Sequence, residues 1–191
     1  NFIKLNAKQL RDADPEDIKT QIKEIKRRSL YFILENIYDT YNIGGIFRLA
    51  DALNAEKIYI CGQSETPPNH KIKKASIGTD KIVPWEYKIS AAEAVEQLRR
   101  ETDNKITIYA VEQSPESLHY TEPNYKLPLG LIFGNETFGV TPETLKLADK
   151  AVVIPMYGIN KSLNVIVAAA IVSYWAVNQI YTLGKKESQL T

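Results

Sequence analysis

The chain has 191 residues, of which 44% are hydrophobic and 25% are charged, a composition typical of a folded globular domain rather than a disordered one. Its formal net charge is +1, so no overall field indicates a nucleic-acid partner, and any basic surface has to be a local patch. Two histidines and one cysteine are too few for a metal site of imidazole and thiolate groups, exclude an intrachain disulfide, and fit the reducing cytoplasm.

The first 29 residues predict a helical extension. Asp14 followed by Pro15 is typical of a helix start, because a capping carboxylate and a proline both suit the first turn. Three isoleucines between residues 18 and 25 then lie on one face, and basic residues cover the rest. The segment has no apolar core of the kind that a secretion signal needs. We expect residues 1–29 to extend a single domain over residues 30–191.

From Leu30 onward, apolar runs alternate with helical patterns. The runs LYFILENI, KIYICG, KITIYAV, LGLIFG and KAVVIP are apolar on both faces, which is typical of buried parallel strands. The segment KIVPWEY predicts a short edge strand, because Pro84 cannot donate a hydrogen bond to a neighbour. The expected fold is α/β: a mostly parallel sheet flanked by helices.

Three helices are predicted between the strands, and one long stretch is predicted to be a loop. Apolar residues at helical spacing indicate a helix from Ile43 to Leu53, and SAAEAVEQLRRE opens on the capping pattern of Ser90 and Glu93. A short helix is expected to begin at Thr141. The polar and basic residues 63–81 predict a loop.

The last helix carries the longest apolar stretch, from Val165 to Val177. That stretch is shorter than the roughly 20 residues that a membrane span requires, so we expect a buried helix in a soluble protein. The whole helix is apolar around too much of its circumference for one core face. We therefore expect a two-fold homodimer, with Tyr174 and Trp175 supplying contact area.

The segment GNETFG follows directly after the strand LGLIF. Its two glycines allow the backbone to approach a ligand, or they merely permit a tight turn. Ligands of open parallel sheets bind beyond the carboxyl ends of the strands, so the position favours a site. Glu136 follows the end of a buried strand, where a charged side chain is expected either to have a bonding partner or to serve a function. This segment alone leaves both interpretations open.

The segment NIGGIFR places Asn42 at the start of a helix and Arg48 on its polar side. An arginine suits bidentate contact with a phosphate. The alternative is an exposed arginine paired with an acid such as Asp51, and the segment alone favours that alternative.

The segment IPMYGINKSLNV brackets Leu163 with the polar residues Ser162 and Asn164 just where the apolar helix begins. It predicts either a plain strand-to-helix connection or a loop that holds a ligand with its backbone. The sequence contains neither a G-x-G-x-x-G after a strand nor a G-x-x-x-x-G-K-[ST] motif, and no serine nucleophile elbow. These absences count against nicotinamide, ATP and serine-hydrolase chemistry.

Taken together, NIGGIFR, LIFGNETFGV and IPMYGINKSLNV resemble, in order and content, the three signature motifs of the SpoU/TrmH family of RNA ribose-2'-O methyltransferases, within the SPOUT class of α/β-knot proteins. The resemblance covers residues 30–181 and implies a deep C-terminal trefoil knot. It implies S-adenosylmethionine as the methyl donor, bound among three loops largely by backbone groups. Because the chain has no separate N-terminal RNA-binding domain like that of some rRNA-modifying members, tRNA is favoured over rRNA as the substrate.

The resemblance also assigns site residues. It places cofactor contacts at Val111, Gly134, Ile154, Met156 and Leu163, and active-site positions at Asn42, Arg48, Glu136, Ser162 and Asn164. The resemblance implies that Arg48 takes part in activating the ribose hydroxyl. Because an arginine stays protonated, we expect it to anchor an RNA phosphate, and we expect Glu136 to orient Asn42 and fix the loop. RNA contacts are expected from basic residues of the polar loop and the first helix: Lys71, Lys73, Lys74, Lys81, Arg27 and Arg28, with Lys23 and Lys26 beside them. Ile166 departs from the small polar residue frequent in the family, and a packing change is expected there.

Three alternatives remain open at this point. A knotted tRNA base methyltransferase shares the fold, although NIGGIFR resembles the ribose enzymes. A non-catalytic RNA-binding module would keep the fold without chemistry, and the retained active-site residues argue against it. A nucleotide-binding oxidoreductase lacks its glycine fingerprint here. We expect no metal and no membrane contact, and the methylated nucleotide is not determined by the sequence.

Overall fold

The computed structural model describes residues 4–14, 22 and 25–187. Most of the helix predicted to begin after Asp14 therefore lies outside the described residues. The N-terminal part that is described contains a short helix, α1 (Ala7–Asp12), which the sequence pattern did not predict. The Asn6 side-chain oxygen caps this helix by accepting hydrogen bonds from two backbone N–H groups. The Gln9 side-chain oxygen in turn accepts a hydrogen bond from the Asn6 N–H, which completes a capping box.

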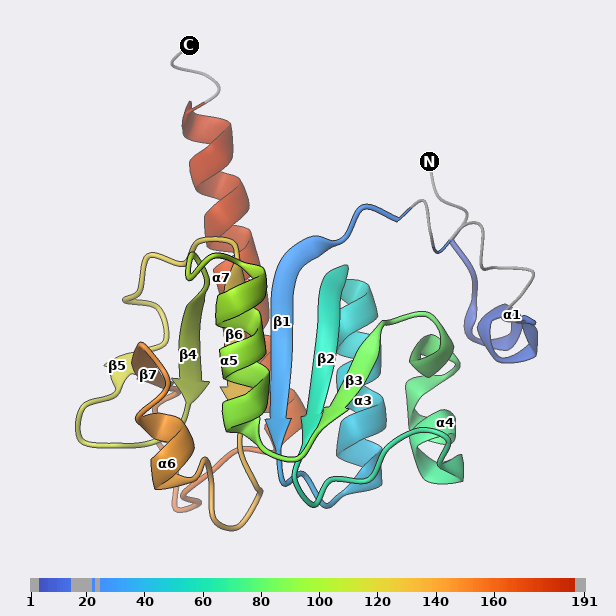
Figure 1. Ribbon diagram of the computed structural model, residues 1–191, viewed down its shortest axis with the longest axis horizontal. Helices are drawn as coiled ribbons and strands as arrows, with labels where there is room; N and C mark the ends of the chain where they lie inside the picture. The colour runs from blue at the N-terminus through green and yellow to red at the C-terminus, as the bar shows by residue number, and fades with distance from the viewer. Residues whose placement is uncertain (1–3, 15–21, 23–24, 188–191) are drawn as a thin grey trace.

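The core of the fold is a seven-stranded sheet in the order β3-β2-β1-β6-β4-β7-β5, and every strand pair in it is parallel (Figure 1). The strands are β1 (Arg28–Glu35), β2 (Ala55–Cys61), β3 (Trp85–Lys88), β4 (Thr107–Val111), β5 (Leu118–His119), β6 (Leu129–Phe133) and β7 (Lys150–Val153). The predicted α/β class with a mostly parallel sheet is confirmed. The two-residue strand β5 was not predicted, because so short a run carries no periodic signal.

The register brings the carboxyl ends of the central strands to one edge. Phe133 at the end of β6 pairs with Leu34 of β1 on one side and with Val111 of β4 on the other, and Val111 also pairs with Val152 of β7. The loops that follow β1, β4, β6 and β7 therefore start side by side, at the lower edge of the sheet in Figure 1. Parallel sheets place ligand sites at this edge.

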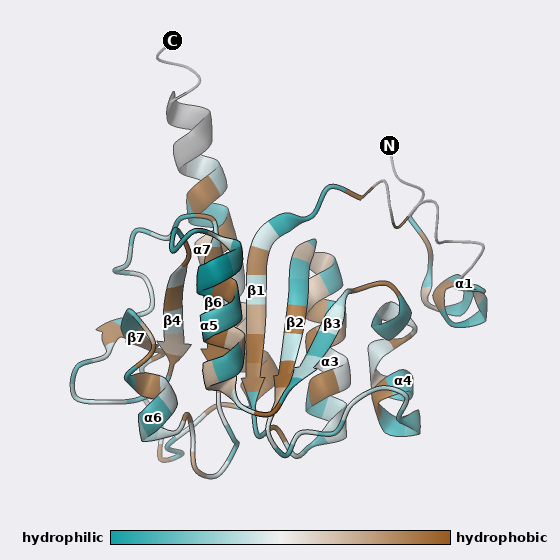
Figure 2. Cartoon of the chain, in the orientation of Figure 1, coloured by the Kyte–Doolittle hydropathy of each residue, from teal (hydrophilic) through white to brown (hydrophobic). Residues whose placement is uncertain are grey.

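Helices cover both faces of the sheet. On one face lie α3 (Thr40–Ala52) and α7 (Val165–Glu187), and on the other lie α5 (Ala91–Glu101) and the short α6 (Pro142–Leu145). Alternate residues of β1 serve the two layers: Phe32 belongs to the cluster under α3 and α7, and Ile33 to the cluster under α5. The apolar strands between polar helix surfaces are visible in Figure 2.

The prediction of a loop over residues 63–81 is wrong. The segment contains α4 (His70–Ser76) and a 3-10 turn, η1 (Thr79–Lys81). Asn69 caps α4 by accepting hydrogen bonds from two backbone N–H groups, and Ile72 is the apolar residue that it buries. With two turns and one buried isoleucine, α4 offers too little periodicity to be recognised, and its packing against α3 supplies the stability instead.

Gly44 explains how α4 comes so close to α3. A Cβ atom at Gly44 would lie 2.6 Å from the Ala75 Cβ and 2.7 Å from the Ile72 carbonyl oxygen. The neighbouring Gly45 faces α7, where a Cβ would lie 2.4 Å from Ile166 Cδ1. The two glycines of NIGGIFR therefore let two helices pack against α3, and Ile166 fills the space beside the second.

The last helix forms where it was predicted, but the prediction that its apolar stretch is buried holds for one stripe only. The helix α7 continues to Glu187, and its segment Val165–Thr182 is long and apolar enough to cross a membrane by length and composition alone. Only 22% of that segment is buried. Because the stripe that is buried, which includes Ala169 and Val172, belongs to the sheet's core cluster, the same properties fit a core helix with one open face.

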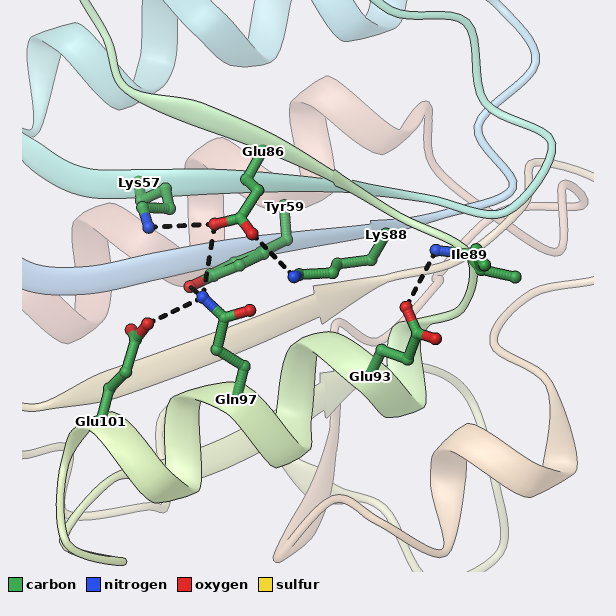
Figure 3. A network of polar contacts seen from close by, with 8 residues as sticks. All are labelled: Lys57, Tyr59, Glu86, Lys88, Ile89, Glu93, Gln97 and Glu101. Carbon is green, nitrogen blue, oxygen red and sulfur yellow. Dashed lines mark hydrogen bonds and ion pairs between the residues drawn. The ribbon is translucent and has the colours of Figure 1, made fainter.

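The edge strand β3 carries a network of polar side chains shared with β2 and α5 (Figure 3). Glu86 pairs with Lys57 at 3.2 Å and with Lys88 at 2.7 Å, and Gln97 of α5 donates to Glu86 at 3.3 Å and to Glu101 at 2.7 Å. Partly exposed ion pairs of this kind contribute little stability. Charges along a sheet edge do discourage pairing with another strand, so this network suits the position of β3 at the edge of the sheet.

Candidate active site

A cavity of about 300 Å³ opens at the carboxyl edge of the sheet. Three segments line it: residues 111–113 at the end of β4 and just beyond it, residues 134–139 after β6, and residues 154, 156 and 161–163 of the loop after β7. The first turns of α7 complete the wall through Val165 and Ala168. Its volume lies at the lower end of the range of about 300–1,000 Å³ that is usual for small-molecule sites.

The loop after β6 is held in shape by Asn135. Its side-chain oxygen accepts hydrogen bonds from the backbone N–H groups of Thr137 (2.8 Å) and Phe138 (2.9 Å), and its Nδ2 donates to the Asn36 carbonyl at 2.9 Å. At Gly134 a Cβ atom would lie 2.2 Å from the carbonyl carbon of Gly139. The loop therefore closes through direct backbone contact, which only glycine permits at this position.

Asn42, Glu136 and Asn164 connect the three sequence motifs. Asn42 Nδ2 donates to Glu136 Oε1 at 2.8 Å, and Asn164 Nδ2 donates to Asn42 Oδ1 at 3.1 Å. Asn42 is 4% exposed, so both ends of its amide are used within the protein. Asn164 Oδ1 in turn accepts from the Ile166 N–H at 2.9 Å, in the first turn of α7. These contacts join α3, the loop after β6 and the loop after β7.

Arg48 lies two turns along α3 and is exposed. Within the described part of the chain its guanidinium has no hydrogen bond or ion pair, so the pairing with Asp51 that the alternative required does not form there. Asp51 instead interacts with Arg27, which opposes the rise in the pKa of the Asp51 carboxyl that its burial causes. Arg48 is thus free to contact a ligand at the surface.

The predicted cofactor residues come together in the cavity. Its lining includes all five of them, Val111, Gly134, Ile154, Met156 and Leu163, and also Glu136 and Ser162. Asn42, Asn164 and Arg48 lie outside the lining. Asn42 and Asn164 reach it through their hydrogen bonds to one another and to Glu136.

The predicted RNA-binding residues divide into two groups. Lys71, Lys73 and Lys74 are exposed on α4. The other three use their charged groups inside the fold: Lys81 Nζ donates to the Arg11 and Ala13 carbonyls, Arg27 donates to the Ala55 and Ile82 carbonyls, and Arg28 donates to the Leu53 carbonyl and to Tyr181. Lys26 is exposed, and Lys23 lies outside the described residues.

Several residues of the site were not predicted. Glu112 follows β4 and lines the cavity together with Gln113 and Lys161. Glu35, the last residue of β1, is 5% exposed, and its carboxylate accepts hydrogen bonds from the backbone and hydroxyl of Thr141 and from the Thr144 hydroxyl. The sequence signal that could have indicated these two glutamates is their position, because Glu35 ends an apolar strand and Glu112 directly follows one. Among the described residues, no three His, Cys, Asp or Glu side chains are grouped so as to hold a metal ion.

Comparison with known proteins gives matches over most of the chain. Residues 29–174 match the SpoU rRNA Methylase family. The chain is 32% identical over 162 residues to the tRNA (guanosine(18)-2'-O)-methyltransferase of Aquifex aeolicus (strain VF5), covering 83% of this chain and 74% of that protein. The crystal structure of the A. aeolicus TrmH/SpoU tRNA modifying enzyme has a TM-score of 0.74 at 31% identity and covers 93% of this chain and 84% of that one.

A second structure is that of the SpoU methyltransferase AviRb from Streptomyces viridochromogenes in complex with the cofactor AdoMet. Its TM-score is 0.72 at 28% identity, and the match covers 82% of this chain and 60% of that chain.

Proposed function

Because the chain belongs to the SpoU rRNA Methylase family, we propose that it is an RNA 2'-O-ribose methyltransferase that uses S-adenosylmethionine and acts on tRNA. The observation that carries the proposal is the meeting of the three motifs around one cavity, joined by the hydrogen bonds of Asn42 to Glu136 and Asn164. The tRNA substrate is supported by the names of the relatives, which specify guanosine 18 of tRNA.

The cavity fits the proposed donor. Ile154 and Leu163 offer apolar surface for a ring, and Leu163 is 37% exposed, so a ligand would cover it. Because Gly134 has no side chain, the backbone of the loop after β6 is accessible to a ligand beside it. When bound, S-adenosylmethionine supplies an electrophilic methyl group on a sulfonium. The residues that would hold it are the five that line the cavity and were expected to contact it.

The protein's own part in the reaction is to position a ribose hydroxyl and its phosphate. Asn42 and Asn164 are fixed by their mutual hydrogen bond, so the polar groups next to the lining residue Ser162 are already ordered before a substrate arrives. Arg48 is exposed and unpaired among the described residues, and its planar guanidinium suits a phosphate oxygen pair. An arginine stays protonated, so its role is to anchor the phosphate rather than to accept a proton.

The RNA surface we propose runs from Arg48 over α4. Gly44 holds α4 against α3 one turn before Arg48, and Lys71, Lys73 and Lys74 are exposed on α4. Contacts to phosphates make affinity fall steeply with salt concentration. We do not assign Lys81, Arg27 or Arg28 to this surface, because their charged groups are bonded within the fold.

We propose that the protein is a two-fold homodimer in which the second copy covers the open face of α7. Tyr174 is 51% exposed and Trp175 is 40% exposed on this face, although the core stripe of the same helix is buried. Large aromatic side chains of this kind are typical of interface cores. Light scattering at micromolar concentration should give the mass of a dimer, and the mass of a monomer would contradict the proposal.

We further propose that the last loops thread as a trefoil knot, that residues 30–191 form the methyltransferase domain, and that residues 1–29 extend it. The meeting of the loops after β6 and β7 at one cavity supports the knot. A cytoplasmic location, the compartment of tRNA, fits the lone Cys61, which is buried and whose burial raises the thiol pKa to about 12. A crystal structure would trace the threading.

The test of the proposed function is to separate donor binding from methyl transfer with Arg48→Ala. We expect the affinity for S-adenosylmethionine to stay within twofold of wild type and single-turnover transfer to a tRNA transcript to fall by about 10²-fold or more, because misalignment alone can cost that much. Arg48→Lys should restore part of the rate. Arg100→Ala, which removes an exposed arginine from α5 on the opposite face, is the control and should transfer normally.

Analysis of the digested product decides between the remaining candidates. A 2'-O-methylated nucleoside supports the proposal, with guanosine 18 as the first position to examine. A base-methylated nucleoside would support the base methyltransferase instead. Binding of tRNA without donor binding or transfer would support the non-catalytic module.

A further inference from the structure

The cavity contains a carboxylate that the proposed function does not yet use. Glu112 is the first residue after β4, and its side chain lines the cavity. The backbone N–H of Gln113 donates to its Oε1 at 2.8 Å, and the backbone N–H of Val140 donates to its Oε2 at 2.7 Å. Each carboxylate oxygen is therefore held by one amide, and the group is fixed between two of the three loops of the site.

Gly139 shows how closely this carboxylate is packed. Its φ angle is +72°, and a Cβ atom there would lie 2.1 Å from Glu112 Oε2. Any side chain at this position would displace the carboxylate, so the loop after β6 is shaped to receive it. The two amide donors also keep the charge solvated when a ligand displaces water from the cavity.

The charges that line the cavity do not cancel. They are the carboxylates of Glu112 and Glu136 and the ammonium of Lys161, which leaves one net negative charge. Glu136 and Lys161 are exposed, and Glu136 is bonded to Asn42, whereas Glu112 is partly buried. Water screens the two exposed groups, so Glu112 dominates the field inside the cavity.

We propose that Glu112 makes the cavity favour the cationic methyl donor over its neutral demethylated product. The inference rests on the proposed function. S-adenosylmethionine carries one more positive charge than S-adenosylhomocysteine, because its sulfur is a sulfonium and that of the product is a thioether. A sphere of the cavity's volume is about 8 Å across, and we take this length as the scale of the distance between the sulfur and the carboxylate. At this distance a unit charge changes affinity by about twofold in water and by about thirtyfold near a protein surface, and for a partly buried carboxylate we take about threefold to tenfold.

Selection by charge would assist turnover. The product differs from the donor by one methyl group, and shape alone discriminates weakly between ligands that differ by so little. A carboxylate that attracts only the cationic form weakens the hold on the product once the methyl group has left, and fresh donor then displaces it more readily.

The test compares three ligands by calorimetry: S-adenosylmethionine, S-adenosylhomocysteine, and sinefungin, in which an amine-bearing carbon replaces the sulfonium and keeps the positive charge. With Glu112→Gln we expect the affinities for S-adenosylmethionine and sinefungin to fall by about threefold to tenfold and that for S-adenosylhomocysteine to stay within twofold. Glu116→Gln, an exposed acid of the next turn outside the lining, should change none of them.

Glu112→Asp guards against a purely structural effect, because it keeps the charge but shortens the arm that reaches Val140. All three ligands should bind it more weakly, with the wild-type ratio between them retained. If Glu112→Gln weakens all three ligands equally, the inference is overturned and Glu112 only connects the loops. If the wild type binds none of the three, the proposed function fails as well.

Discussion

Asn42 provides the sharpest test of the site, because its partners can be exchanged. It donates to Glu136 at 2.8 Å and accepts from Asn164 at 3.1 Å. Asn42→Asp keeps the acceptor for Asn164 but removes the donor and places a second carboxylate against Glu136. At about 4 Å two like charges repel by about 1 kcal/mol in water and about 4 kcal/mol near a protein surface, and we take about 2 kcal/mol because Glu136 is exposed.

The lost hydrogen bond adds about 1 kcal/mol, so Asn42→Asp should lower the free energy of unfolding by about 3 kcal/mol. Glu136→Gln alone should cost about 1 kcal/mol, because the new amide oxygen at position 136 still accepts from Asn42 but the hydrogen bond loses the help of the negative charge. In the double variant the new amide at position 136 donates to the new carboxylate at position 42, which reverses the original bond. We expect the double variant to lie within about 1 kcal/mol of wild type.

Urea unfolding of the wild type, both single variants and the double variant completes a double-mutant cycle. Simple addition of the single effects gives a loss of about 4 kcal/mol, so the expected coupling is about 3 kcal/mol. A double variant whose loss equals the sum of the single losses, within about 0.5 kcal/mol, would refute the contact between Asn42 and Glu136.

Gly44→Ala should destabilise the protein by about 1–2 kcal/mol in urea unfolding, because overpacking against α4 outweighs the gain in helix propensity of about 1 kcal/mol. Gly158→Ala, where a Cβ would meet nothing within 4 Å, is the matched control and should change stability by less than about 0.5 kcal/mol. Burial raises the pKa of Asp51, so the folded state binds more protons than the unfolded state above pH 4 or so, and stability is lost as pH rises from there through the folded pKa. Asp51→Asn should therefore gain stability relative to wild type between about pH 4 and pH 7, and a difference that is constant with pH would contradict this reasoning.

The chain's own pattern was sufficient for six of the seven strands of the sheet and for the helices α3, α5, α6 and α7. Strands buried on both faces, such as β1 and β6, read as continuous apolar runs, and α5 opens on a recognisable serine cap. The helix α4 was not predicted, because it is two turns long and buries too few residues to give a periodic pattern. What stabilises it is its contact with Gly44 of α3, which lies 26 residues or more away in sequence.

The site divides in the same way. The three motifs and the residues expected in them could be identified from the sequence through a family resemblance, and the structure brings the five expected cofactor residues to one cavity. Glu112 lies in no motif and was missed. Its place follows from a glycine with positive φ and an amide, both some 27 residues further along the chain, that meet it only after folding.

The charged residues show most clearly what the sequence alone could determine. The sequence shows directly that basic residues cluster near residues 23–28 and 71–81, because this clustering depends only on neighbours along the chain. It could not determine which of them face solvent. Nothing in the sequence distinguishes Lys81 and Arg28 from an exposed basic residue such as Lys71, yet each of the two donates to a backbone carbonyl of a distant segment. Arg48 has no such partner among the described residues. Hydrogen-bond partners distant in sequence are set by tertiary packing, so only the folded structure decides which charges remain available for a ligand.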